Sequence, residues 1–324
     1  MTSARQEPAK IQPTTHVAGS GVPIPVLSVV AKVAGPAVVV SANLHGDECT
    51  GIGVVHALAR ILPTRLLRGS VFLYPSLNPQ GLIEGTRRLP DDATDPNRAF
   101  PGNARGTPAE RHAARVWADV ISRRPELVLD LHTDTGGAIP YAILDRVVRG
   151  PPGLTEACLR FAEASGLTVL REYPKDRYLR FDLDRSLPGA LVNGPGVPAV
   201  TLEVGPRRRI DRGAVEDALL AVLGILTALG LCVAPAPQHA TFQGGGPWRR
   251  ESGPRTTRTG LLVPLVVGGE RFEAGTLLAE VRALDGEVRE RLVARSPGFV
   301  IALPEVAHVA IGTSCATVAI PDEG

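Results

Sequence analysis

Short apolar segments alternate with longer segments of helical periodicity over the first two-thirds of the chain. Apolar and β-branched runs predict strands at residues 26–30, 37–42, 71–75, 126–132 and 198–204. Apolar residues at helical spacing predict helices over residues 50–62, 107–123 and 218–234. The first helix is expected to stop at Pro63, and the second begins with a capping box formed by Thr107 and Glu110.

The predicted strands are apolar over nearly their whole length. Such strands are typical of a sheet that helices cover on both faces, with functional sites at the strand ends. We therefore expect an α/β domain over residues 15–234.

The pattern changes after residue 234. Residues 235–254 are rich in glycine and proline, which predicts a linker. Beyond it, short β-type segments are separated by glycine-bearing turns. They predict a small all-β, barrel-like domain over residues 255–324.

Composition and charge exclude several classes of protein. The net charge of +2 on 324 residues shows no bias toward nucleic acid or anionic membranes. The four cysteines are far apart and form no CxxC pair, as expected of reduced thiols. The N-terminus lacks the apolar stretch of a secretory signal, and residues 218–234 are interpreted as a buried helix rather than a membrane span. We expect a cytoplasmic protein with a small-molecule substrate and no nucleic-acid or membrane partner.

Residues of metal-binding types follow two of the predicted strands. His45 and Glu48 come directly after the second strand, and His132 ends the fourth. Two imidazoles and one carboxylate form a set that holds catalytic zinc and leaves one position open for water. Gly46 lets the loop turn tightly, so that both of its ligands converge on one ion. Asp130 is a candidate to orient the second ring nitrogen of His132.

Four further polar residues are candidates for chemistry beside this metal. Glu203 lies on an apolar strand, where burial should raise its pKa and suit it to general base catalysis. Arg87, Asn97 and Arg98 follow the third strand, and the two arginines would supply fixed positive charge. One arginine would polarise a substrate carbonyl and another would grip a substrate carboxylate.

Each of these residues alone also fits an ordinary structural role. His45 fits a loop histidine bonded to the backbone, and Asp130 with His132 fits a structural pair at a strand end. Glu203 fits the partner of a buried arginine, and residues 97–98 fit a surface turn. Because these residues all lie at the ends of predicted strands, a shared metal site is favoured over several unrelated structural roles.

The motifs also occur in an order typical of one known family. HGDE, NPxG, GTR, DxNRxFPG, DLHTD and TLEVG resemble the motifs of the succinylglutamate desuccinylase/aspartoacylase family, within the zinc carboxypeptidase (M14-like) superfamily. The resemblance covers nearly the whole chain. It implies a carboxypeptidase-like mixed sheet flanked by helices, with a small C-terminal β-domain.

The resemblance implies a zinc-dependent amidohydrolase. Its substrate would be a small N-acyl amino acid or N-acyl amine, from which it removes an acetyl, succinyl or similar group. The resemblance assigns zinc binding to His45, Glu48 and His132, and it assigns general base and acid catalysis to Glu203.

The resemblance also assigns substrate contacts. It gives carbonyl polarisation to Arg87, with the adjacent Arg88 as an alternative in register, and substrate binding to Asn97 and Arg98. The family usually has leucine at Pro96, so this loop departs from the pattern. The family's late substrate arginine has no clear match, and its possible substitutes are Arg177, Arg180 and Arg185.

Two other functions remain open at this point. A metallocarboxypeptidase would release C-terminal residues from peptides, whereas a non-catalytic metal-binding protein would hydrolyse neither peptides nor N-acyl amino acids. A structural zinc site needs a fourth protein ligand and no general base, which favours catalysis. Which acyl group is cleaved, and whether the protein is a homo-oligomer, is left open.

Overall fold

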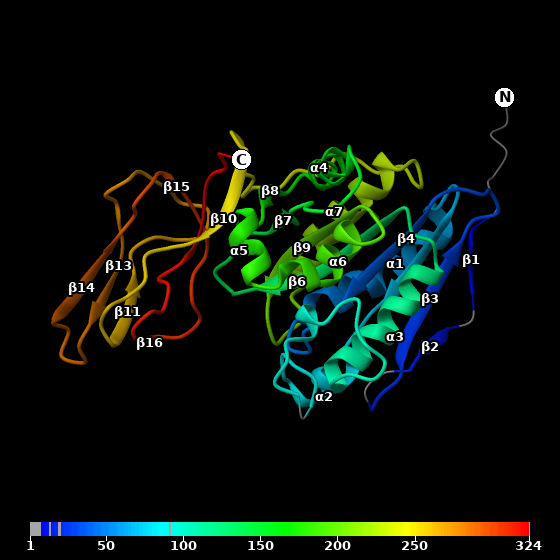
Figure 1. Ribbon diagram of the computed structural model, residues 1–324. Helices are drawn as coiled ribbons and strands as arrows, with labels where there is room; N and C mark the ends of the chain where they lie inside the picture. The colour runs from blue at the N-terminus through cyan, green and yellow to red at the C-terminus, as the bar shows by residue number, and fades with distance from the viewer. Residues whose placement is uncertain (1–7, 13, 19–20, 91, 324) are drawn as a thin grey trace.

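The computed structural model describes residues 8–12, 14–18, 21–90 and 92–323. They form a large α/β body joined to a smaller β region (Figure 1). The strands of the α/β body are β1 (Lys10–Ile11), β2 (Thr15–Val17), β3 (Ile24–Val30), β4 (Ala37–Ala42), β5 (Ser70–Tyr74), β6 (Leu127–Asp134), β7 (Tyr141–Leu144), β8 (Thr168–Arg171) and β9 (Ala199–Pro206).

Seven helices and two short 3₁₀ turns connect these strands in the described ranges. They are α1 (Thr50–Arg65), α2 (Pro79–Glu84), η1 (Pro96–Arg98), α3 (Pro108–Ser122), α4 (Leu154–Ala164), α5 (Lys175–Arg180), η2 (Leu183–Arg185), α6 (Leu187–Asn193) and α7 (Arg212–Ala228). The C-terminal strands are β10 (Trp248–Ser252), β11 (Gly260–Pro264), β12 (Arg271–Phe272), β13 (Leu277–Arg282), β14 (Val288–Val293), β15 (Gly298–Ala302), β16 (His308–Val309) and β17 (Thr317–Pro321).

A 13-stranded mixed sheet runs through the molecule in the order β1-β3-β5-β4-β6-β9-β7-β8-β10-β17-β15-β12, with β2 paired to β3. Its centre, β5-β4-β6-β9, is parallel, and β7 runs antiparallel to β9. The central strands are buried on both faces, and α1 packs against α7 over them. This confirms the expected α/β class, and it brings the carboxyl ends of β4, β6 and β9 to one edge.

Two of the predicted helices, α1 and α3, form close to their expected bounds, whereas α7 covers residues 212–228 instead of the expected 218–234. The side chain of Thr107 accepts from the backbone of Glu110, and the Glu110 side chain accepts in return, which makes the capping box. The expected stop at Pro63 is wrong, because α1 continues to Arg65. Proline removes only one backbone donor in this last turn, and the amide of Leu66 still donates to the carbonyl of Leu62.

The C-terminal strands divide between two sheets. β11, β13, β14 and β16 form a separate four-stranded antiparallel sheet, whereas β10, β12, β15 and β17 extend the large sheet. β10 lies inside the segment expected as a linker, and it pairs with both β8 and β17. Within the described parts of the chain, no helix is long and apolar enough to cross a membrane.

Candidate active site

The carboxyl ends of three neighbouring parallel strands carry the candidate site. His45 and Glu48 lie in the loop between β4 and α1, and His132 lies near the end of β6. Glu203 on β9 is the direct strand partner of His132. The register of the sheet therefore brings together residues that are far apart in sequence.

His45, Glu48 and His132 form one buried group. Each offers a ligand atom within 4.8 Å of the others. Glu48 shares hydrogen bonds with both imidazoles, at 2.8 Å to Nδ1 of His45 and 2.9 Å to Nδ1 of His132. Two imidazoles and one carboxylate with so little exposure fit the donor set of a catalytic zinc ion, so this group could hold a metal.

Asn43 shapes the loop that carries His45 and Glu48. Its backbone has a φ of 56°, in the left-handed region that asparagine tolerates better than most residues. Its side-chain amide donates to the carbonyls of His45, Gly46 and Glu48, at 3.0, 3.0 and 2.9 Å. The hydroxyl of Ser76 donates to its Oδ1 at 2.6 Å. The sequence analysis missed this residue, whose only signal is its place between the strand and the motif.

Gly46 matters for a close approach between backbones. A Cβ atom there would lie 2.2 Å from the carbonyl carbon of Gly81 and 2.5 Å from the amide of Leu82. Both neighbours belong to the backbone of α2, which cannot yield as a flexible side chain would. Only glycine therefore lets this helix pack against the loop.

Asp130 holds the ring nitrogen of His132 that does not bond Glu48. Its Oδ2 lies 2.9 Å from Nε2 of His132, and Ser41 donates to its Oδ1 at 2.7 Å. Burial disfavours a charged imidazole, but Asp130 and Glu48 outweigh it and raise the pKa of His132. Burial alone would raise the pKa of Glu48, but the two histidines lower it well below its usual value. The cluster thus holds a carboxylate in its charged form, as a metal ligand must be.

Glu203 is an acid of the site with a raised pKa. Burial raises it to about 8, with repulsion from Glu48 and Asp134 adding to the effect and His132 opposing it. A carboxyl with this pKa can both accept and release a proton near neutral pH.

Arg87 and Asp95 bracket the cluster on its outer side. Arg87 donates to Oε1 of Glu48 at 2.8 Å and to Oδ2 of Asp95 at 3.2 Å. The other oxygen of Asp95 lies 3.0 Å from Nε2 of His45. Burial opposes the charge of Arg87, but the two carboxylates outweigh it and raise its pKa. The sequence analysis gave Asp95 no role, although it begins the DxNR motif.

Asn97 and Arg98 both line the cavity beside this cluster. The side-chain oxygen Oδ1 of Asn97 accepts from the backbone amide of Leu187 at 2.8 Å, which leaves its NH₂ group for a ligand. Arg98 donates to the carbonyls of Asn97 and Phe181 and forms no ion pair with a described residue. Burial lowers its pKa, because Asp95 and Glu172 offset that effect only in part.

Proline suits the position of Pro96. It begins η1, where Asp95 caps the turn by accepting from the amide of Asn97. The first position of a helical turn needs no amide donor, so proline fits there. The departure from the usual leucine therefore leaves the loop well formed.

Several basic candidates lie outside the cavity. Arg88 is exposed and is not among the cavity-lining residues. The three arginines considered as late substrate ligands are also absent from the lining; they are Arg177, Arg180 and Arg185. Arg177 instead bonds both oxygens of Glu251, at 2.6 and 2.7 Å.

The cavity has a volume of about 260 Å³ and a largely polar wall. Its lining includes five residues that the sequence analysis did not find: Tyr141, Asp145, Glu172, Tyr173 and Arg250. Arg250 comes from β10, in the segment expected as a linker, and it bonds Glu172. Burial opposes its charge, but Glu172 and nearby tyrosines outweigh it and raise its pKa.

Comparison with known proteins identifies this arrangement. The family model of the succinylglutamate desuccinylase/aspartoacylase catalytic domain matches residues 34–229, more than half of the chain. The chain belongs to the succinylglutamate desuccinylase/aspartoacylase family. It is 34% identical over 127 residues to an N-alpha-acetyl-L-2,4-diaminobutyric acid deacetylase of Halomonas elongata. That alignment spans 39% of this chain and only 36% of the relative.

Solved structures of the family share the fold. Succinylglutamate desuccinylase/aspartoacylase from Rhodobacter sphaeroides matches with a TM-score of 0.80 at 22% identity, over 99% of both chains. The product-bound ectoine utilization protein EutE (DoeB) from Ruegeria pomeroyi also matches with a TM-score of 0.80, at 20% identity. That match covers 97% of this chain and 99% of the other.

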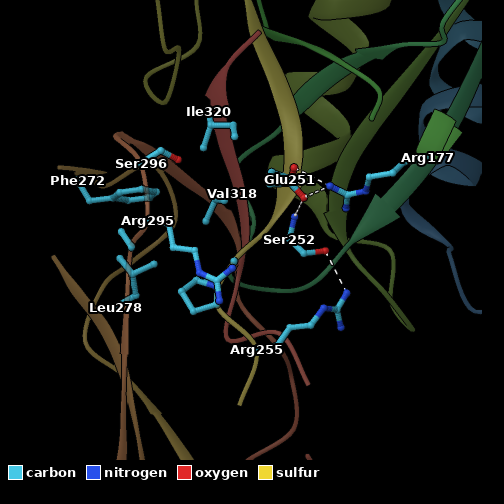
Figure 2. A pocket seen from close by; sticks show the side chains of 13 residues that line it. Arg177, Glu251, Ser252, Arg255, Phe272, Leu278, Arg295, Ser296, Val318 and Ile320 are labelled. Carbon is cyan, nitrogen blue, oxygen red and sulfur yellow. Dashed lines mark hydrogen bonds and ion pairs between the residues drawn. The ribbon is translucent and has the colours of Figure 1, made fainter. Parts of the chain in front are cut away.

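A larger cavity, of about 440 Å³, lies away from the family motifs (Figure 2). It is bordered by β10, β17 and the C-terminal strands, with Phe272, Leu278 and Val318 on its apolar side. Its Glu251 is already bonded to Arg177. It contains none of the candidate metal ligands, so the smaller polar cavity is the candidate active site.

Proposed function

We propose that this protein is a zinc-dependent deacylase that removes an acyl group from a small N-acyl amino acid or N-acyl amine. One observation carries the proposal: Glu203 lies directly beside the buried group of His45, Glu48 and His132, at the wall of a polar cavity. Membership of the family supports the reaction class, and the deacetylase relative supports a small N-acetylated amino acid as substrate.

His45, Glu48 and His132 would hold the zinc ion. When bound, zinc supplies Lewis-acid polarisation and lowers the pKa of water. Asp130 fixes the orientation of His132 through the hydrogen bond to its Nε2.

Glu203 carries the proton transfers in this proposal. A water oxygen forms a bond to the acyl carbon, and the bond between that carbon and the amide nitrogen breaks. Glu203 accepts one proton of the water and returns it to the leaving nitrogen, which yields a carboxylic acid and a free amine; at neutral pH these ionise to a carboxylate and an ammonium ion. A pKa raised by burial suits a group that must take and give the same proton.

Three residues would bind and polarise the substrate. Arg87, held by Glu48 and Asp95, places positive charge where the carbonyl oxygen gains negative charge. Arg98 has no ion pair among the described residues and would bind a substrate carboxylate, with the free amide NH₂ of Asn97 beside it. Arg87 takes the carbonyl role rather than Arg88, because Arg88 is exposed.

We also propose a cytoplasmic location and a small-molecule substrate rather than a macromolecular partner. All four cysteines are free thiols, which supports a reducing compartment.

The test is the variant Glu203→Gln, assayed on N-acetyl and N-succinyl amino acids with zinc-loaded protein. We expect its zinc content to match the wild type and its kcat to fall by about 10²-fold or more, because the proton acceptor is lost. Glu163→Gln, an exposed glutamate, is the matched control and should keep full activity.

Three results would contradict the proposal. Full activity of Glu203→Gln would remove Glu203 from the mechanism. Release of C-terminal residues from peptides, without deacylation, would indicate a carboxypeptidase. Absence of both zinc and hydrolysis would favour a non-catalytic protein.

A further inference from the structure

Two carboxylates lie at the ends of neighbouring strands in the candidate cavity. Asp145 directly follows β7, and Glu172 directly follows β8. The two strands are parallel, with Leu144 paired to Arg171, so the two acids lie at the same level. Both line the cavity, and neither takes part in the proton transfers proposed above.

The alternation of side chains along β7 points Asp145 into the cavity. Tyr141, Ile143 and Asp145 are two residues apart, share one face of the strand and all line the cavity. Tyr141 is the strand partner of Glu203, so Asp145 lies four residues, about 13 Å, along the strand from the level of Glu203. An acyl carbonyl that lies beside Glu203 is therefore too far away to contact Asp145. Asp145 faces another part of the substrate.

Arg98 indicates which half of the substrate reaches Asp145. Its guanidinium is close enough to Asp145 to act on that carboxyl electrostatically. If Arg98 binds the carboxylate of the amino acid, the amine half of the substrate extends toward Asp145. The side chain of the amino acid is then the part of the substrate that contacts Asp145.

Asp145 has no direct ion-pair partner among the described residues, although Arg98 and Arg250 favour its charged form from a distance. Its Oδ1 accepts from the hydroxyl of Tyr178 at 2.8 Å and, weakly, from Ser186 at 3.5 Å. Its Oδ2 accepts from no described residue, and no described cationic nitrogen lies within ion-pair distance.

Glu172 differs from Asp145 in its partners. It is bonded by the guanidinium of Arg250 and the amide of Tyr173. Burial and repulsion from Glu172 raise the pKa of Asp145 to about 7. A bound cation would replace the missing partner of Asp145.

We propose that Asp145 binds an ammonium group on the side chain of the substrate, so that the enzyme prefers N-acyl diamino acids. This inference rests on the deacylase function proposed above. An ammonium group would donate to the free Oδ2 of Asp145, while the neighbouring Glu172 adds negative potential.

The test compares matched substrates that differ in one terminal group. The pairs are Nα-acetyl-2,4-diaminobutyrate with Nα-acetyl-2-aminobutyrate, Nα-acetylornithine with Nα-acetylnorvaline, and Nα-acetyllysine with Nα-acetylnorleucine. The wild-type enzyme should have the higher kcat/KM for the charged member of at least one pair. In Asp145→Asn, that ratio should fall by about tenfold or more, as expected when a charged hydrogen bond is lost. The control Asp176→Asn, an exposed position on α5, should keep the wild-type ratio.

The outcomes separate this inference from the proposed function. If no N-acyl amino acid is hydrolysed, the deacylase function itself is wrong. If all pairs are hydrolysed without a preference for charge, or if Asp145→Asn keeps the preference, the ammonium site is wrong and the deacylase function stands.

If Asp145→Asn does not fold, inhibition of the wild-type enzyme by free amino acids provides a second test. Ornithine should then inhibit the wild-type enzyme more strongly than norvaline does. Equal inhibition would overturn the ammonium site.

Discussion

Asn43 holds three residues of the metal-binding loop although it offers no ligand atom. Its amide bonds the carbonyls of His45, Gly46 and Glu48, and all of these groups are buried. Replacing a side chain that orients metal ligands typically lowers metal affinity by about 10- to 100-fold.

The variant Asn43→Ala should therefore weaken zinc binding by about that factor, because the loop loses its internal hydrogen bonds. Zinc affinity can be measured by competition with a chromophoric chelator. Asn103→Ala, at an exposed asparagine, is the control and should bind zinc as the wild type does. Equal affinity in both variants would show that the loop is positioned by other contacts.

His112 offers a residue-scale test of acid stability. It is buried on α3, its Nε2 bonds the carbonyl of Leu77 at 2.7 Å, and its Nδ1 has no partner. Burial lowers its pKa to about 4, with Arg115 adding to the effect and the Leu77 bond opposing it. The unfolded chain, with a pKa of about 6.5, binds the proton first as the pH falls. Stability through this group is therefore lost between about pH 6.5 and pH 4.

Urea unfolding of the metal-free protein at pH 7 and pH 5 measures this effect. Between these values the wild type should lose about 2 kcal/mol through His112, and His112→Gln should lose that much less. Glutamine keeps a side-chain donor for Leu77 and does not titrate. Parallel losses in the two proteins would show that His112 is protonated in the folded state.

Among the elements, those with a strong local signal were predicted from the sequence. The capping box of Thr107 fixed the start of α3, and β-branched runs located β4, β6 and β9. β10 was missed because it forms a strand through its pairing with β8 and β17, and its own sequence carries no clear strand pattern.

At the scale of the whole molecule, the C-terminal region completes both the sheet and the cavity. β10 covers the edge of β8, and Arg250 on β10 neutralises the buried Glu172. Without this strand, an unpaired sheet edge would be exposed and a buried carboxylate would lose its partner.

A chain truncated after residue 234 should therefore aggregate and lose deacylase activity. Size-exclusion chromatography and hydrolysis of N-acetyl amino acids test this, with the full-length chain as the control. A monomeric, active truncated chain would show that the first 234 residues form an independent enzyme.

The sequence by itself determined the α/β class and the family, and it proposed the group of His45, Glu48 and His132. These follow from local periodicity and from short motifs whose chemistry is visible within a few residues. The tertiary structure decided which side chains line the cavity: Asp145, Glu172 and Arg250 joined it, while Arg88 and Arg177 did not. It also placed Asp95 beside the imidazole of His45. Strand register and long-range pairing set those positions, because contacts between residues distant along the chain leave no periodic trace in it.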